Sequence, residues 1–167
     1  YTGVNNSPLL TVGTWTVYSN TVISAEVYDT FSGGTLSVLL GTISAQTCAL
    51  PGYYTLSFST PVPVSMGNDF YIKVRYELPS KGRPIPIELA ETGYAVPVIE
   101  SGRCWTSSDG STWEAVGSDV PDAQWDLAIN AFASIGKIWN GTSTSWTDAS
   151  GWSPSGVPGP TNDVLIP

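Results

Sequence analysis

Apolar and polar residues alternate along much of this chain with a period of two, which is typical of β-strands. A clear case is the run in which Ile23, Ala25 and Val27 are separated by polar residues. Such a run places its apolar side chains on one face of a strand, toward a core. No segment keeps a helical period. We therefore predict strands over residues 10–17, 23–28, 36–43, 54–59 and 70–77.

The segment from Cys104 to Ala133 predicts a β-hairpin followed by a half-buried strand. Trp105 and Trp113 lie on two short runs joined by a connection that contains Asp109-Gly110. An Asp-Gly pair favours a hairpin because the turn requires positive φ angles. After a polar loop, apolar side chains recur at every second position and predict one face of a strand: Trp125, Leu127, Ile129 and Ala131.

Composition supports an all-β fold. The chain has 167 residues with 17 Gly and 13 Pro, and only 12% of its residues are charged. A helical domain of this length would be richer in Ala, Glu and Lys. Length and composition together predict an antiparallel β-sandwich with one well-filled core.

Net charge argues against two classes of partner. The formal charge is −8, with only six Lys and Arg residues in total. Nucleic acids and anionic membranes are recognised by clustered cations, so neither is an expected partner. No apolar run approaches the roughly 20 residues of a membrane span, so membrane insertion is not expected either.

Catalysis is not expected, because the chain contains no histidine. That absence removes the Ser-His-Asp and Cys-His arrangements and the commonest metal ligand. Asp119, Asp122 and Asp126 form the one carboxylate cluster, with Asp109 nearby in sequence. Glycoside hydrolysis would require two carboxylates at a set separation in a cleft. Asp119 and Asp122 are candidate ligands for Ca²⁺, although the loop lacks the alternation of an EF-hand and a solvated loop is the preferred interpretation.

The two cysteines, Cys48 and Cys104, fit neither a CxxC motif nor zinc-ligand spacing. A disulfide between them would close a loop of more than fifty residues and stabilise the fold by about 4 kcal/mol in the chain-entropy model. We expect this disulfide, since the composition is typical of an extracellular protein. The alternative is two buried free thiols.

Candidate binding residues are those that lie beside turns or in the proline-rich segment 79–97. Proline removes a backbone donor, so this segment predicts a sheet edge or an ordered loop, with a binding rim as the alternative. Other aromatic residues, such as Trp105, Trp125, Tyr54 and Tyr76, are assigned to the core, and Lys73 and Arg75 to a solvated face. The candidates for ligand contact are Trp113, Tyr94, Tyr53, Arg83 and Glu88.

Residues 9–133 resemble the lectin-like β-sandwich domain appended to secreted bacterial and archaeal peptidases of the papain class. The resemblance implies a jelly-roll-type sandwich that accompanies a catalytic domain, and it carries over no catalytic residue. The family pattern also has a strand before Leu10, which is not evident here. The segments that carry the resemblance, in order, are VYDTFSGGTLSVLLG (27–41), residues 51–77, RPIPIE (83–88), SSDGSTWEAV (107–116) and LAINAFA (127–133).

Beyond Ala133 the sequence resembles the Trp/Gly/Pro-rich opening of repetitive, often β-helical, regions in large bacterial surface proteins. Trp139-Asn140-Gly141, Trp146, Trp152 and the closing run Asp163–Pro167 carry this resemblance. We therefore predict a lectin-like domain over residues 1–134 and an extension over 135–167, which would begin a following domain of a longer polypeptide.

Two functional hypotheses follow. The first is a non-catalytic binding module of a secreted or cell-surface prokaryotic protein, which binds a glycan or another surface polymer through aromatic side chains. The second is a structural block of a surface layer, filament or stalk, which assembles with neighbouring domains or subunits through strand or sheet-edge contacts.

Overall fold

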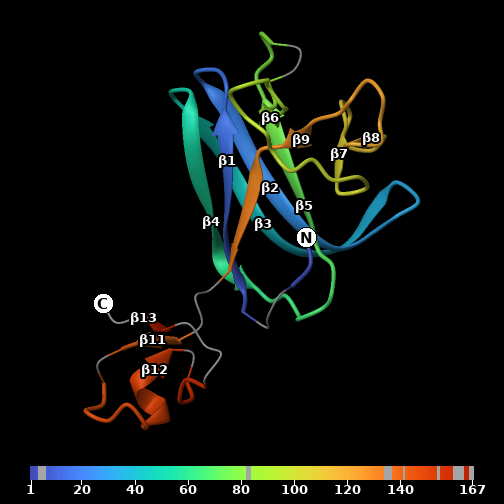
Figure 1. Ribbon diagram of the computed structural model, residues 1–167. Helices are drawn as coiled ribbons and strands as arrows, with labels where there is room; N and C mark the ends of the chain where they lie inside the picture. Colours follow the sequence, from blue (N-terminus) through green and yellow to red (C-terminus); the bar gives the residue numbers. More distant parts are fainter. Residues whose placement is uncertain are drawn as a thin grey trace.

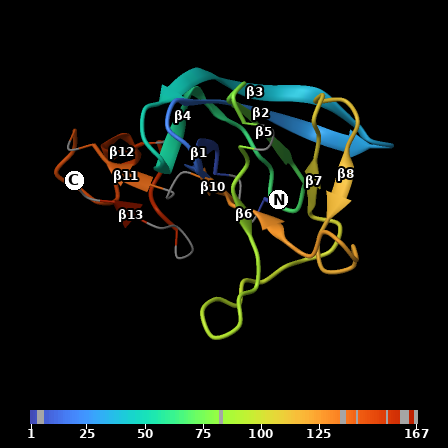
Figure 2. The same cartoon turned by 90° about the horizontal axis from the view of Figure 1, so that it is seen from above.

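Two three-stranded antiparallel sheets face each other in the computed structural model (Figures 1 and 2). The structure describes residues 1–3, 7–81, 84–133, 137–140, 142–153, 155–159 and 164–165. The predicted all-β sandwich is thus confirmed. In the described part of the chain, no helix has the length and apolar character that would let it cross a membrane.

The first sheet has the strand order β10-β1-β4. Val12 lies at its centre, opposite Ala131 on one side and Leu56 on the other. The pairing of distant segments means that this sheet depends on the 104–133 region for its third strand. Its strands are β1 (Leu9–Thr16), β4 (Gly52–Val62) and β10 (Ile129–Ala133).

The second sheet has the order β3-β2-β5, so β5 is an edge strand. Gly33 and Gly34 form the two-residue turn between β2 and β3, with φ angles of 57° and 78°. Two successive positive φ angles are what a tight hairpin turn of this kind requires. The strands are β2 (Thr21–Ser32), β3 (Thr35–Cys48) and β5 (Tyr71–Glu77).

The core lies between the sheets and is built from the alternating positions that the sequence predicts. Ile23, Ala25 and Val27 of β2 are buried, and they pack with Leu56 and Phe58 of β4 in one cluster. Side chains at alternate positions of β5 pack against this cluster as predicted: Ile72, Val74 and Tyr76.

The 104–133 region forms a hairpin and two short strands. The hairpin pairs β7 (Cys104–Thr106) with β8 (Glu114–Val116), as predicted. The predicted single strand is divided into β9 (Asp126–Leu127), which pairs with β6 (Ile87–Glu88), and β10, which pairs with β1. Ala128 separates the two strands. Its side chain is buried, and its N–H donates to the carbonyl of Pro86 instead of to β1, the strand that pairs with β10.

A strand-like segment does precede β1, although the sequence alone shows no evident strand before Leu10. Thr2 bridges Asp69, and the N–H groups of Gly3 and Phe70 bond the carbonyls of Asn68 and Tyr1, at 2.9 Å in each case. Three residues carry too little alternation to be recognised as a strand, so sequence patterning does not detect this pairing.

The C-terminal segment contains a separate small sheet, in which β11 pairs antiparallel with β12 and parallel with β13. Beside it, the indole rings of Trp139, Trp146 and Trp152 pack together with centroids 5.0–5.4 Å apart. Its elements are β11 (Lys137–Trp139), the 3₁₀ turn η1 (Ala149–Gly151), β12 (Trp152–Ser153) and β13 (Val164–Leu165).

The expected disulfide is not formed, and both cysteines are free thiols. Cys48 ends β3 opposite Thr21, whereas the neighbour of Cys104, Trp105, contacts Phe31 at the far end of β2. Ten residues of strand separate Thr21 from Phe31, or about 30 Å at roughly 3.3 Å per residue. A disulfide requires Cα atoms within about 7 Å, so this fold holds the two thiols too far apart.

Candidate ligand-binding cleft

A cleft of about 430 Å³ opens along the edge of β5, where the β7–β8 hairpin and the β6–β9 pair meet the second sheet. Segments that are far apart in the sequence line it, including Tyr1, Lys73, Glu88 and Trp113. Figure 1 shows the hairpin beside β5, away from the C-terminal segment. No single stretch of sequence therefore contains the site.

One wall of the cleft is aromatic and is centred on Phe31. The Phe31 ring lies 4.7 Å from the Trp105 ring, 5.8 Å from Tyr71 and 6.2 Å from Trp113, measured between centroids. The two Trp rings meet it edge-on, at interplanar angles of 62° and 81°, which is a favoured arrangement for aromatic pairs. All four side chains are partly exposed, so their faces are available to a ligand.

The cleft lining also carries carboxylates. Glu88 of β6 and Asp126 of β9 lie directly opposite each other in the antiparallel pair, and both line the cleft. Directly opposed residues project from the same face of a sheet, so their side chains are neighbours. Asp126 also accepts a hydrogen bond from the Cys104 thiol.

Two basic side chains line the cleft, and each has a carboxylate partner. Lys73 Nζ lies 2.8 Å from Glu26 Oε2, and the hydrogen bond from Lys73 is the main reason that the pKa of Glu26 is lowered. Arg103 Nε lies 3.9 Å from Glu100 Oε2, a longer and more exposed contact. The unpaired charge in the cleft is therefore negative.

Cys104 and Tyr1 also line the cleft. Burial, reinforced by the bond to Asp126, raises the pKa of Cys104 to about 12, so the group is a neutral thiol at physiological pH. The Tyr1 hydroxyl donates to the carbonyl of Ile129, and burial raises its pKa as well. Both groups are thus hydrogen-bond donors in their neutral form rather than nucleophiles.

The hairpin over the cleft is fixed at its tip by Asp109. The Asp109 carboxylate accepts bonds from the N–H groups of Ser111 and Thr112, both at 2.7 Å, and these bonds lower its pKa. Gly110 follows with φ 76°. The Asp-Gly pair therefore lies in the connection of a hairpin, as predicted, but this connection has seven residues (107–113) and is not a two-residue turn.

The base of the hairpin is fixed by Gly117. A Cβ at this position would lie 2.5 Å from the carbonyl oxygen of Glu100, so only glycine allows the two segments to approach this closely. The hydroxyls of Ser101 and Ser118 also bond across this contact, at 2.8 Å. Residues 100–103, which supply part of the cleft wall, are positioned by it.

The five candidate contact residues do not form one site. Trp113 and Glu88 both line the cleft. Tyr53 lies on the first sheet opposite Trp15, with the two rings 5.5 Å apart and edge-on, and it is not part of the cleft lining. Arg83 lies outside the described residues.

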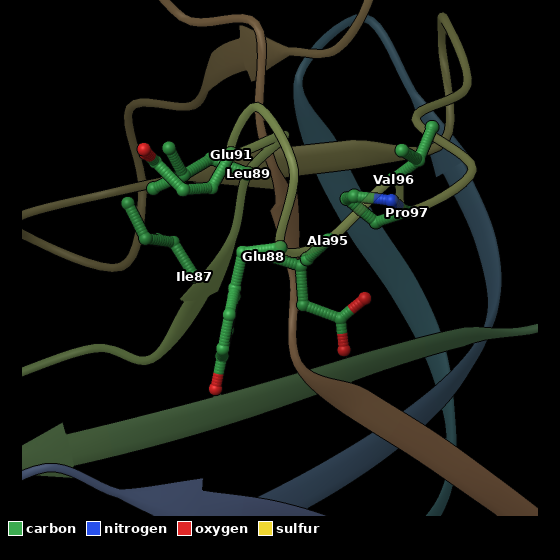
Figure 3. Close-up of a pocket in the computed structure, with 8 residues that line it drawn as sticks. Ile87, Glu88, Leu89, Glu91, Ala95, Val96 and Pro97 are labelled. Atoms are coloured by element: carbon green, nitrogen blue, oxygen red, sulfur yellow. The ribbon is translucent and has the colours of Figure 1, made fainter.

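Tyr94 belongs to a second, shallower hollow of about 590 Å³. Figure 3 shows its lining, with Ile87 and Leu89 on one side and Val96 and Pro97 on the other. The Tyr94 side chain is 91% exposed and therefore makes little contact with the rest of the protein. Few polar groups converge on this hollow, which makes it a poorer candidate site than the cleft.

The calcium ligands considered for the 119–122 loop, Asp119 and Asp122, lie near the surface. Both are exposed in a turn. Among the residues that the structure describes, no group of three Cys, Asp or Glu side chains is placed to hold a metal ion.

Sequence patterning misses several cleft residues. It assigns Trp105 to the core and Lys73 to a solvated face, yet both line the cleft. Phe31 and Tyr71 are not among its candidates, because one precedes a glycine turn and the other lies on the outward face of a strand. The hairpin places Trp105 and Trp113 against Phe31, and nothing in the local alternation of β2 or β5 predicts that contact.

A comparison with known families is consistent with this site. Residues 1–133 match the family described as "Lectin like domain". The chain belongs to this family. No curated protein and no solved structure shows a significant match to the chain. The family match covers both sheets and the whole cleft and ends with β10, so the cleft is a feature of the lectin-like domain itself.

Proposed function

We propose that this lectin-like domain is a non-catalytic module that binds a glycan in the cleft along β5. The observation that carries the proposal is the wall formed by Phe31, Tyr71, Trp105 and Trp113, four partly exposed aromatic side chains in one concave site. Aromatic rings offer flat apolar faces on which the apolar faces of sugar rings stack. Polar groups in the same cleft then select among sugar hydroxyl and amino substituents.

A binding role fits the carboxylates better than hydrolysis does. Acid catalysis of glycoside cleavage needs one carboxylic acid in a desolvated environment that keeps it protonated. Glu88 is exposed to solvent, and Asp126 accepts bonds from Cys104 and from the N–H of Leu127. Such an arrangement suits two hydrogen-bond acceptors that hold a ligand.

We also propose that the module acts outside the cell, as part of a larger secreted or cell-surface protein that it attaches to a surface polymer. The low proportion of charged residues and the aromatic cleft support this placement. The small C-terminal sheet would then begin the next part of that protein.

A glycan array tests the binding proposal. The protein is labelled and applied to the array, and Trp113→Ala is compared with Tyr94→Ala, which removes an aromatic side chain that the structure leaves 91% exposed outside the cleft. We expect retention of a defined glycan class, a loss of about tenfold or more for Trp113→Ala, and no loss for Tyr94→Ala. Absence of any bound glycan, or equal binding by Trp113→Ala and the wild type, would contradict the proposal.

A structural role is the second candidate, and the edge position of β13 favours it. β13 has a partner, β11, on one side in the described part of the C-terminal sheet. An edge strand can extend a sheet into a neighbouring copy by β-augmentation. Sedimentation velocity over a hundredfold concentration range tests this role: concentration-dependent assembly would support it, and a constant monomer mass would exclude it.

A further inference from the structure

We propose that the glycan recognised by the cleft carries free, protonated amino groups, as de-N-acetylated amino sugars do. This inference rests on the proposed function, because it concerns the ligand class of the same cleft. It is carried by two carboxylates that form no ion pair in the described part of the chain and by the aromatic side chains that line the same cleft.

The first argument is the opposed pair of carboxylates. Glu88 and Asp126 are directly opposite each other in the β6–β9 pair, an arrangement in which like charges destabilise a sheet. Within the described part of the chain, no Lys or Arg forms an ion pair with either side chain. A cation bound between the two carboxylates would relieve their repulsion, so bound ligand and fold stabilise each other at this point.

The second argument is the pairing of the cations that the cleft does contain. Lys73 is held by Glu26 at 2.8 Å, and Arg103 lies near Glu100 at 3.9 Å. Neither is therefore the partner of the Glu88–Asp126 pair. What the cleft offers to a ligand is negative charge, which disfavours sulfated and uronic acid glycans as ligands.

The third argument is the aromatic wall. The faces of Trp and Tyr rings carry negative electrostatic potential and attract cations, with Trp the strongest. Trp105, Trp113 and Tyr71 line the cleft together with the two carboxylates. An amino sugar would use both features at once, since its ring stacks on an aromatic face while its ammonium group lies near the carboxylates. The protein's net charge of −8 also raises the local concentration of a cationic ligand.

The test compares three β-1,4-linked hexamers that differ only in the substituent at carbon 2: an amine (glucosamine), an acetamide (N-acetylglucosamine) and a hydroxyl (glucose). Affinities are measured by isothermal titration calorimetry in moderate salt at a pH where the amine is protonated. We expect the amine to bind at least tenfold more tightly than the other two.

Variants then separate recognition in the cleft from general attraction to an acidic protein. The double variant Glu88→Gln/Asp126→Asn is expected to reduce the amine preference to less than threefold. Its two amide side chains keep the shape of the carboxylates, and the amide oxygen at position 126 can still accept the bonds that Asp126 accepts. The matched control is Glu91→Gln/Asp119→Asn, which removes the same two charges from exposed positions outside the cleft lining and should retain the preference.

Each outcome has a distinct meaning. Equal or tighter binding of the acetamide or hydroxyl hexamer would overturn the amino-sugar inference and leave the proposed glycan function standing. Equal losses in the two double variants would also overturn it, because the attraction would then be non-specific. If no hexamer binds, the inference is wrong, and the glycan array decides separately whether the cleft binds any glycan.

Discussion

The hydroxyl groups of Thr14 and Tyr76 are hydrogen-bonded to each other across the core, and they join the two sheets. Thr14 belongs to β1 and is completely buried, and its hydroxyl also donates to the carbonyl of Ala128 at 2.8 Å. A threonine hydroxyl has a single hydrogen, so Tyr76 of β5 is the donor toward Thr14. This chain of bonds connects β5, which lines the cleft, to the point where β9 and β10 separate.

Replacing either residue should reveal how much each bond contributes to stability. Tyr76→Phe removes one donor and leaves Thr14 bonded to Ala128, so we expect a loss of about 1 kcal/mol in the free energy of unfolding. Thr14→Val removes the acceptor of Tyr76 and the donor to Ala128, and leaving two buried groups unsatisfied should cost about 2–4 kcal/mol. Urea denaturation measures both. A larger loss for Tyr76→Phe than for Thr14→Val would contradict this assignment of donors.

Phe31 is expected to organise the aromatic wall of the cleft. Phe31→Ala would remove the ring that contacts Trp105, Trp113 and Tyr71, so both indoles should become more mobile and more exposed. We expect a red shift of tryptophan emission and a loss of about 1–2 kcal/mol, less than for a fully buried Phe because Phe31 is partly exposed. Phe132→Ala, at a 45% exposed position on the first sheet, is the control and should leave the emission unchanged.

The fold could be predicted from sequence to a greater extent than the cleft. The alternation of Ile23, Ala25 and Val27 correctly predicts that one face of the strand is buried, because successive side chains of a strand point to opposite sides. The cleft depends on tertiary structure, since the hairpin that carries Trp105 must be placed against Phe31, which itself contacts Tyr71. No local pattern encodes that placement.

The binding candidates show the same limit. Trp113 lies next to a turn and does line the cleft, whereas Tyr53 satisfies the same criterion but lies over Gly13 on the other sheet, where a Cβ would meet its ring. Proximity to a turn predicts exposure, and only the arrangement of segments decides which exposed aromatic residues converge.

Stability should fall in alkaline solution because of Cys104. Its pKa is raised by burial from an ordinary value of 9.0 to about 12 in the folded protein. A raised pKa means that the neutral thiol is favoured by folding, so this contribution is complete below pH 9 and is lost as the pH rises from about 9 to 12. Denaturation midpoints at pH 7.5, 9 and 10.5 should decline progressively. Cys104→Ala should decline less over the same range, and parallel curves for the two proteins would contradict this role.

Both cysteine thiols should react rapidly only after the protein unfolds. Cys48 is 1% exposed, and Cys104 is partly buried with a raised pKa, so neither provides an accessible thiolate at pH 8. We expect slow reaction with an aromatic disulfide reagent in buffer and two rapid equivalents in denaturant without reductant. No free thiol in denaturant would show instead that the two cysteines are bridged.

Two glycines of the hairpin provide a matched test of how its base holds the cleft in place. Gly110 and Gly117 both have positive φ, of 76° and 144°. A Cβ at Gly110 would meet only Lys73 Cε, at 4.0 Å, whereas at Gly117 it would lie 2.5 Å from the Glu100 carbonyl. Gly110→Ala should therefore lower the free energy of unfolding by about 1 kcal/mol from backbone strain alone. Gly117→Ala should lower it by about 3 kcal/mol, because the 100–103 segment must also move.

Urea denaturation measures these two losses of stability, and titration with the glycan selected on the array should show weakened binding for Gly117→Ala alone. Equal effects of the two substitutions would mean that the contact with Glu100 does not position the cleft wall.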